Sequence, residues 1–188
     1  MSVDSERFFV LTGGPGAGKT SLISALVEAG FSTTPEAGRA IIRQQQAVGG
    51  SALPWLDPPA FAELMIGFDM NSHRLAADSN GPVFFDRGVP DTVGYLRLSG
   101  LPVPAHMFAA ADELRYNRRV LVLPPWSEIF GQDAERKQNF AEAVRTFEAV
   151  TSVYRDLGYE LVEVPRAPVE VRMRFVLAIA GDVPLPAR

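Results

Sequence analysis

Residues 13–20 read Gly-Gly-Pro-Gly-Ala-Gly-Lys-Thr, and the rest of the chain can be organised outward from this stretch. It matches the pattern G-x-x-x-x-G-K-[ST], in which a glycine-rich turn joins a strand to a helix. The apolar run Phe8–Leu11 before it suits a buried parallel strand. After it, Ser21–Glu28 carries leucine, isoleucine and valine on one helical face. Both flanks therefore predict a phosphate-binding loop.

The residue types in this loop match the chemistry of a triphosphate. Glycines allow backbone dihedrals that turn successive N–H groups inward, and the following helix adds the positive end of its dipole. Lys19 supplies a point charge for the β- and γ-phosphates, and the hydroxyl of Thr20 is a ligand for Mg²⁺. The sequence thus predicts a site for a nucleoside triphosphate with Mg²⁺. Its residues are Gly13, Gly14, Pro15, Gly16, Ala17, Gly18, Lys19, Thr20 and Ser21.

The remaining apolar runs alternate between strand and helix patterns, and this alternation predicts a parallel sheet covered on both faces. We therefore expect one α/β domain over residues 1–188, with a three-layer α/β/α architecture. Further strands are predicted at Phe31–Thr34, Val83–Asp86, Arg119–Leu123 and Glu160–Val164. Further helices are predicted at Ala37–Ala47, Ala60–Asp78, Asp91–Ser99, Ala105–Tyr116, Asp133–Leu157 and Val169–Ala180.

Composition excludes several classes of site. The chain of 188 residues has a net charge of -4, which does not support a broadly basic nucleic-acid face. It has no cysteine, so disulfides, cysteine zinc sites and thiol catalysis are excluded, and its two histidines are too few for a multi-histidine metal site. Neither a signal-peptide pattern nor a membrane-length apolar stretch occurs, so we expect a soluble cytoplasmic protein without a membrane partner.

An acid at the end of the predicted strand Val83–Asp86 is the second signal of chemistry. Ligands bind at the carboxyl edge of such sheets, where Asp86 would hold Mg²⁺. Motor-type ATPases usually place a glutamate after this acid, whereas here Arg87 follows, a cation able to pair with an acceptor or a transferring phosphoryl group. Alternatively, Asp86 and Arg87 form a structural ion pair that caps the next helix.

Four segments resemble P-loop kinases, and most nearly the AAA-domain proteins that include enzymes like ribosylnicotinamide kinase. These segments are the phosphate loop, Glu36–Arg39, Phe85–Gly88 and Asp91–Tyr95. The resemblance implies a five-stranded sheet in the order 2-3-1-4-5 and a lid that closes over the nucleotide. It also implies, in some members, transfer of the γ-phosphoryl group of the nucleotide to a small molecule. Other members are known only as predicted ATPases.

Glu36 is the candidate residue for the acceptor hydroxyl, since similar kinases place an acid here that takes the hydroxyl proton. Positioning outweighs base strength in loose phosphoryl transfer, so Glu36 would mainly orient the hydroxyl. Arg39, one helical turn later, would pair with Glu36 or read an anionic acceptor. The alternative for Glu36 is an ordinary acid in the first turn of a helix.

Aromatic residues between Glu36 and Asp86 are candidates for the wall of an acceptor pocket. They are Trp55, Phe61 and Phe68, and aromatic residues at helical spacing are also typical of core. Trp55 is the best pocket candidate because it lies in a loop rich in glycine and proline. Asp91 and Tyr95 share a helical face and would hydrogen-bond the acceptor, unless Asp91 is a plain N-terminal helix acid.

A short lid is predicted over residues 124–137, after the fourth strand. Arg136, more than Lys137, suits contact with the departing γ-phosphate through its planar fork of donors, although both would also suit a solvated helix face. By analogy with similar folds, Arg166 would lie beside the adenine, or in an ordinary turn.

The predicted function is transfer of the γ-phosphoryl group of Mg-ATP to a hydroxyl of a small molecule, such as a nucleoside, sugar or antibiotic. The alternative is ATP hydrolysis or nucleotide sensing without an acceptor. A GTPase is disfavoured because no guanine-reading Asn-Lys-x-Asp motif occurs.

Overall fold

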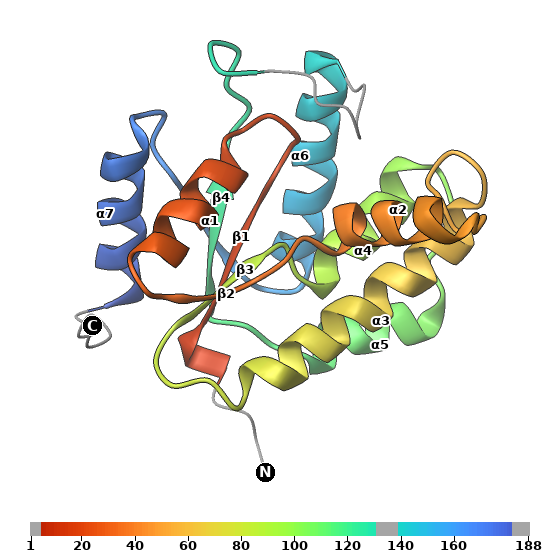
Figure 1. Cartoon of the computed structure of the whole chain (residues 1–188), viewed down its shortest axis with the longest axis horizontal. Coiled ribbons are helices and arrows are strands. Elements are labelled where there is room, and N and C mark those ends of the chain that lie inside the picture. The colour runs from red at the N-terminus through yellow and green to blue at the C-terminus, as the bar shows by residue number, and fades with distance from the viewer. Residues whose placement is uncertain (1–4, 131–138, 182–188) are drawn as a thin grey trace.

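The computed structural model describes residues 5–130 and 139–181. Its centre is a five-stranded sheet in the order β2-β3-β1-β4-β5, with every neighbouring pair parallel. The predicted strand order and the three-layer fold are thereby confirmed (Figure 1). The strands are β1 (Phe8–Gly13), β2 (Ser32–Thr34), β3 (Val83–Asp86), β4 (Arg119–Leu123) and β5 (Glu160–Glu163).

Helices cover both faces of the sheet, as its apolar strands require. Among the described residues, no helix is both long and apolar enough to cross a bilayer. The elements are the short helix η1 (Ser5–Arg7) and α1 (Lys19–Glu28), α2 (Ala37–Val48), α3 (Pro58–Ala76), α4 (Val89–Leu98), α5 (Ala105–Glu113), α6 (Phe140–Asp156) and α7 (Val169–Ala180).

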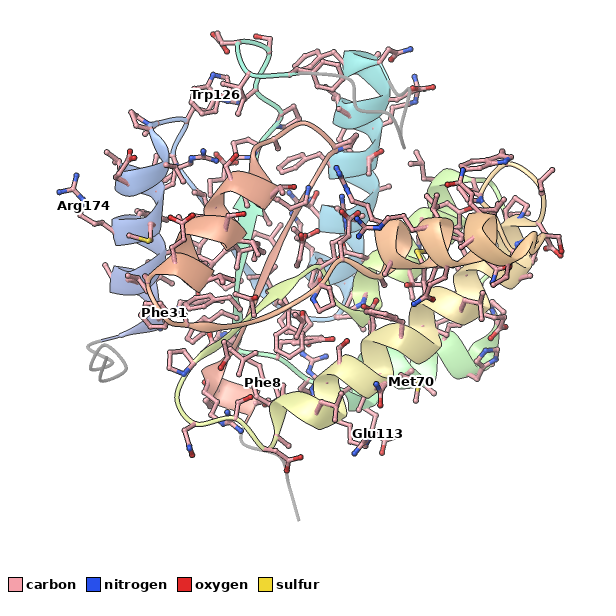
Figure 2. The ribbon with its side chains drawn as sticks, in the orientation of Figure 1. Phe8, Phe31, Met70, Glu113, Trp126 and Arg174 are labelled. Carbon is pink, nitrogen blue, oxygen red and sulfur yellow. The ribbon has the colours of Figure 1, made fainter. Side chains whose placement is uncertain are left out.

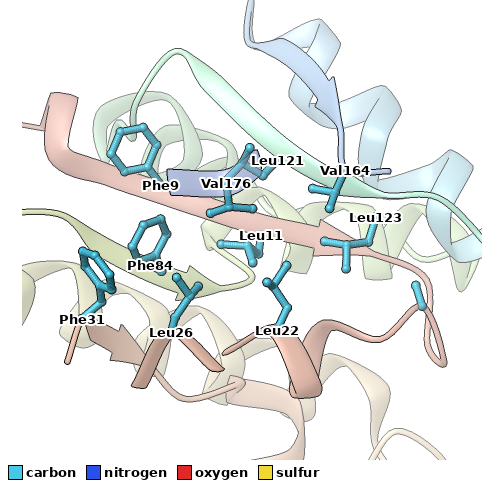
Figure 3. Packing of buried hydrophobic residues seen from close by; sticks show 11 residues of the cluster. Phe9, Leu11, Leu22, Leu26, Phe31, Phe84, Leu121, Leu123, Val164 and Val176 are labelled. Atoms are coloured by element: carbon cyan, nitrogen blue, oxygen red, sulfur yellow. The ribbon is translucent and has the colours of Figure 1, made fainter. Parts of the chain in front are cut away.

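Alternating residues of β1 divide the core into two halves, because successive side chains of a strand point to opposite faces. Phe9 and Leu11 pack with residues of α1 and α7 on one face, as Figure 3 shows for Leu22, Leu26 and Val176. Phe8 and Val10 point to the other face, where Tyr154 of α6 joins them. Burial on both faces holds the central strand rigidly, and with it the loop that follows.

Helix capping moves several predicted boundaries. The predicted start of α3 at Ala60 is wrong, because Asp57 accepts the Ala60 N–H at 3.0 Å and the helix begins at Pro58. It also ends at Ala76 rather than at Asp78. The predicted start of α4 at Asp91 is wrong as well: the helix begins at Val89, after the cap residue Gly88.

Two further helix predictions, for α6 and α5, also differ from the structure. Helix α6 begins at Phe140 because Asn139 is extended and exchanges hydrogen bonds with Glu142 in a capping box. The start predicted at Asp133 lies outside the described residues. Helix α5 ends at Glu113 rather than at Tyr116, since the following chain straightens toward β4.

Candidate functional site

The glycine-rich loop connects the end of β1 at Gly13 to the start of α1 at Lys19. Its backbone takes up left-handed dihedrals at Gly16, where φ is 70°, and at Gly18, where φ is 79°. A residue with a Cβ is strained at such dihedrals, so both positions favour glycine. Gly18 is the N-cap of α1, which begins at Lys19. The positive end of the helix dipole therefore lies at the loop.

Lys19 lies against the loop that it follows. Its side chain is buried, and Nζ donates to the carbonyl oxygens of Gly14 at 2.8 Å and Gly13 at 3.3 Å. Thr20 and Ser21 are exposed in the first turn of α1. The loop thus gathers an ammonium group, two hydroxyls and a helix N-terminus, which together suit a polyphosphate.

Asp86 ends β3 beside the loop, paired in register with Leu11 of β1. It is buried, and its Oδ1 atom has no hydrogen-bond partner among the described residues. Burial, followed by the charge of Glu36, raises the pKa of Asp86 to about 6, although Lys19 opposes the shift. An unsatisfied buried carboxylate oxygen is the kind of atom that a bound cation satisfies.

These residues fit Mg²⁺ better than a metal held by the protein alone. Within residues 5–130 and 139–181, no group of three or more histidine, cysteine or acidic side chains is arranged to hold a metal. Mg²⁺ in nucleotide sites takes one or two protein oxygens, with waters and phosphates completing its shell. Asp86 and Thr20 are able to supply those oxygens.

Arg87 joins the loop to two acidic residues. Its Nη1 atom donates to the carbonyl oxygen of Gly13 at 2.9 Å and to Oδ1 of Asp91 at 3.0 Å. Its Nε atom donates to Oε1 of Glu36 at 3.2 Å. Burial alone would lower the pKa of Arg87, but the neighbouring carboxylates outweigh it and raise that pKa. Arg87 therefore stays charged, and these hydrogen bonds hold its side chain in place.

The Asp86–Arg87 ion pair considered from the sequence is not among the ion pairs of the described residues, where Arg87 pairs with Glu36 and Asp91. Glu36 has the position at the start of a helix that the sequence offered as its alternative. Glu36 is the N-cap residue of α2, but its side chain makes no capping hydrogen bond. Its buried carboxylate instead accepts hydrogen bonds from Arg87 and, at 2.9 Å, from Arg39.

Asp91 is engaged almost entirely with its own protein. Its carboxylate accepts hydrogen bonds from the hydroxyls of Thr12 and Tyr154 and from the backbone N–H of Gly88, besides Arg87. The contact with Gly88 is that of an acid in the first turn of α4, as the sequence alternative had it. These contacts give Asp91 a positioning role at the junction of β1, α4 and α6.

A cavity of about 520 Å³ opens beside the loop, bordered by Pro15 and by residues of α2, α3, α4 and α6. Among the residues predicted for the acceptor side, Trp55, Phe61, Asp91 and Tyr95 line it. The rings of Phe61 and Tyr95 meet edge to face. Trp55 is 54% exposed, whereas Phe61 is buried. Phe68 packs into the core cluster of α2 and α3 and is not part of the lining.

Sequence reasoning missed Asp69, which also lines the cavity and is buried on α3. The signal that could have revealed it is its spacing. Asp69 follows Phe61 and Met65 at intervals of four, so it falls on the apolar face of the helix, where an acid is out of place. The contribution of α6 to the cavity, through Glu142, Thr146 and Val150, had no local signal.

The far side of the loop holds two arginines and a tryptophan. Arg166 donates from Nε to the carbonyl oxygen of Pro125 at 3.1 Å, and Arg172 donates to that of Gly18 at 3.0 Å. The guanidinium of Arg172 lies 5.9 Å from the ring of Trp126, which Figure 2 labels. The predicted lid continues from here, but Arg136 and Lys137 lie outside the described residues.

Comparisons with solved structures find the same fold elsewhere. A structure of NadR protein in complex with NR has 17% sequence identity and a TM-score of 0.70, covering 97% of this chain and 54% of that one. The same protein with NAD and AMP-PNP has 18% identity and a TM-score of 0.65, covering 98% and 51%. This chain therefore spans about half the length of the NadR chains. Deoxyadenosine kinase from M. mycoides, with the products dCMP and dCDP, has 12% identity and a TM-score of 0.61, covering 94% and 100%.

A search of curated proteins finds no match at a significant level. A family model described as "AAA domain" matches residues 8–172, which include the loop, Asp86, Arg87 and every strand of the sheet. With the strand order and the phosphate-binding loop, this match shows that the chain belongs to the AAA-domain family of P-loop proteins.

Proposed function

We propose that this protein transfers the γ-phosphoryl group of Mg-ATP to a hydroxyl group of a small molecule. The observation that carries the proposal is the cavity, since one space is bordered by Pro15 of the phosphate loop and by Glu36 and Arg87. A volume of about 520 Å³ suits a small-molecule ligand. A protein that only hydrolyses ATP needs no such space beside the loop.

On the donor side, the backbone N–H groups of residues 13–20 and Nζ of Lys19 would bind the phosphates. Thr20 and Asp86 would hold Mg²⁺, which supplies charge neutralisation for the phosphate oxygens when bound. Asp86 is able to do so because its Oδ1 atom is not committed to any described residue.

On the acceptor side, Glu36 would orient the hydroxyl and accept its proton. Arg87 and Arg39 hold the Glu36 carboxylate between them, so its position is defined before any ligand enters. Arg87 also reaches the carbonyl of Gly13, which places a cation between the loop and the acceptor. The rings of Trp55 and Tyr95 would pack against a flat or apolar part of the acceptor.

The similar structures support this proposal through their own ligands. NadR protein has been solved with NR and with AMP-PNP, and the M. mycoides enzyme is a deoxyadenosine kinase with bound nucleotide products. Each pairs a nucleotide site with a small molecule on this fold. A role for Arg136 at the γ-phosphate stays a prediction from the sequence.

The test is transfer of label from Mg-[γ-³²P]ATP to a panel of nucleosides, sugars and antibiotics. A labelled small molecule supports the proposal. Release of phosphate at the same rate with and without the panel contradicts it and favours hydrolysis. Lys19→Ala should reduce transfer by about 10²-fold or more, because a preorganised cation at the phosphates is lost. Arg174→Ala on the exposed side of α7 (Figure 2) is the matched control and should leave transfer unchanged.

Glu36→Gln separates the acceptor side from the donor side. The amide keeps the shape of the carboxylate but accepts no proton, so transfer should fall far more than the affinity for ATP. Equal losses in both would assign Glu36 a purely structural role.

A further inference from the structure

Asp69 is a buried acid to which no described residue supplies a hydrogen bond. It lies on the buried face of α3, is 6% exposed, and lines the cavity beside the phosphate loop. Within the described part of the chain, no residue donates a hydrogen bond to its carboxylate or forms an ion pair with it. A buried carboxylate without a donor is costly to the folded protein, so its presence on an apolar helix face needs a reason.

The charges around Asp69 do not supply that reason. Burial, and then the negative charge of Asp91, raise the pKa of Asp69 well above its ordinary value, and Glu36 and Asp86 add to the effect. Arg87 is the cation that opposes the shift. Its hydrogen bonds, however, go to Glu36, Asp91 and the carbonyl of Gly13.

The other polar groups near Asp69 make no hydrogen bond to it within the described residues. The hydroxyl oxygen of Tyr116 accepts a hydrogen bond from the N–H of Val89, and the charge of Asp69 contributes to the raised pKa of Tyr116 without a hydrogen bond between the two. His73, one turn further along α3, donates from Nε2 to the carbonyl oxygen of Arg115. The missing donor therefore does not come from the described residues, and the direction left open is the cavity.

We propose that Asp69 is a specificity-determining residue of this cavity, which accepts a hydrogen bond from a second hydroxyl or an amino group of the acceptor. It thereby selects a neutral or cationic acceptor and rejects one that already carries a phosphate. The inference rests on the proposed transfer to a small molecule, and it adds the charge class of that molecule.

Rejection of anions follows from how charge is distributed around the cavity. Arg87 and Arg39, the cations beside Glu36, both make ion pairs with it. An acceptor phosphate would gain little from arginines that are already paired, and it would meet the buried acids Asp69, Asp91 and Glu36. A hydroxyl or ammonium group meets the opposite situation, because its donor satisfies a buried carboxylate.

The experiment compares acceptors in matched pairs: adenosine with AMP, cytidine with CMP, and ribose with ribose 5-phosphate. Transfer from Mg-[γ-³²P]ATP is measured for the wild type, Asp69→Asn and the exposed control Asp78→Asn. The wild type should prefer the unphosphorylated member of a pair. Asp69→Asn should raise the KM for that member about tenfold or more, with kcat and the KM for ATP changed less than about threefold. Asp69→Asn should also reduce the preference for the unphosphorylated member over the phosphorylated one. The control Asp78→Asn should change neither the KM nor this preference.

Unfolding in urea at pH 8 checks that the effect is not structural. A carboxyl whose pKa is raised in the folded state destabilises the folded protein as the pH rises above the pKa of that carboxyl in the unfolded chain. At pH 8, Asp69→Asn should therefore be at least as stable as the wild type. A less stable variant would make Asp69 a structural anchor and overturn the proposal. An unchanged KM or a wild-type preference for the phosphorylated members would overturn it too. Absence of transfer to every acceptor would instead overturn the proposed function itself.

Discussion

The Nε atom of Arg87 donates to Oε1 of Glu36 across 3.2 Å, although the two residues are 51 positions apart in the chain. Both side chains are largely buried, at 13% and 6% exposure, so water screens this pair weakly. The pair connects the end of β3 to the start of α2 and defines one border of the cavity. The same ion pair therefore contributes to the stability of the protein and holds two residues of the candidate site in place.

Arg87→Ala should therefore destabilise the protein by about 3–5 kcal/mol, because Glu36 and Asp91 are left as uncompensated buried charges. The free energy of unfolding in urea measures this effect. Arg97→Ala is the matched control: its pair with Asp156 is exposed, so the loss should not exceed about 1 kcal/mol. Equal losses in the two variants would contradict the bracing role of Arg87.

Backbone strain at the same position gives a second comparison. Arg87 has φ of 73°, a left-handed value that costs a residue with a Cβ about 1–2 kcal/mol. Arg87→Gly should consequently be more stable than Arg87→Ala by about 1 kcal/mol, although both lose the ion pairs. Unfolding in urea measures the difference between the two variants. Equal stabilities would show that backbone strain at Arg87 does not contribute.

Asp91→Asn should cost about 3 kcal/mol of stability. The amide loses the charge that pairs with Arg87, and its NH₂ group would face a donor in place of one carboxylate oxygen. Thermal and urea unfolding measure the loss. Asp112→Asn, an exposed acid on α5, should change stability by less than about 0.5 kcal/mol.

Two helical glycines should respond to alanine in opposite directions. A Cβ at Gly94 would come within 2.9 Å of the Val150 backbone, so Gly94→Ala should push α4 from α6 and cost about 1–3 kcal/mol. Gly67 on α3 is exposed with open space at its Cβ, so Gly67→Ala should stabilise the protein by about 1 kcal/mol. Equal effects in the two variants would show that α4 and α6 are not packed closely at Gly94.

His73 should make stability depend on pH below neutrality. Burial lowers the pKa of His73, so the unfolded chain binds a proton before the folded protein does. Stability should therefore fall as the pH drops below about 6.5, by up to about 1.4 kcal/mol per pH unit for this one group. Urea unfolding across pH 5–8 should show a shallower fall in His73→Gln.

Much of the fold was readable from local sequence patterns. The loop at residues 13–20 and the apolar strands carry their signals in neighbouring residues, so the strand positions and their parallel arrangement could be predicted. The strand order came from the family resemblance. Helix ends were predicted less well at α3 and α6, where a polar side chain just before the helix caps it, and at α4, which follows Gly88.

In the candidate site, too, residues with a local signal could be predicted, and pairs between distant residues could not. Lys19, Thr20 and Asp86 were predicted because their positions next to a strand or a loop already imply their place at the sheet edge. The sequence considered a pair between Arg87 and its neighbour Asp86, but the structure pairs Arg87 with Glu36 and Asp91. Sequence adjacency misled here because the left-handed backbone at Arg87 directs the side chain elsewhere.

What the sequence determined by itself is the phosphate loop and the alternation of strands and helices, since both depend on hydrogen bonds and apolar contacts between residues close in the chain. The tertiary structure alone decided which charges meet and where space remains. Arg87 pairs with Glu36, and Asp69 has no ion-pair or hydrogen-bond partner among the described residues, because the packing of α2, α3 and α4 against one another brings distant segments together. Electrostatic energy and cavity shape depend on those distances through space, which no local pattern encodes.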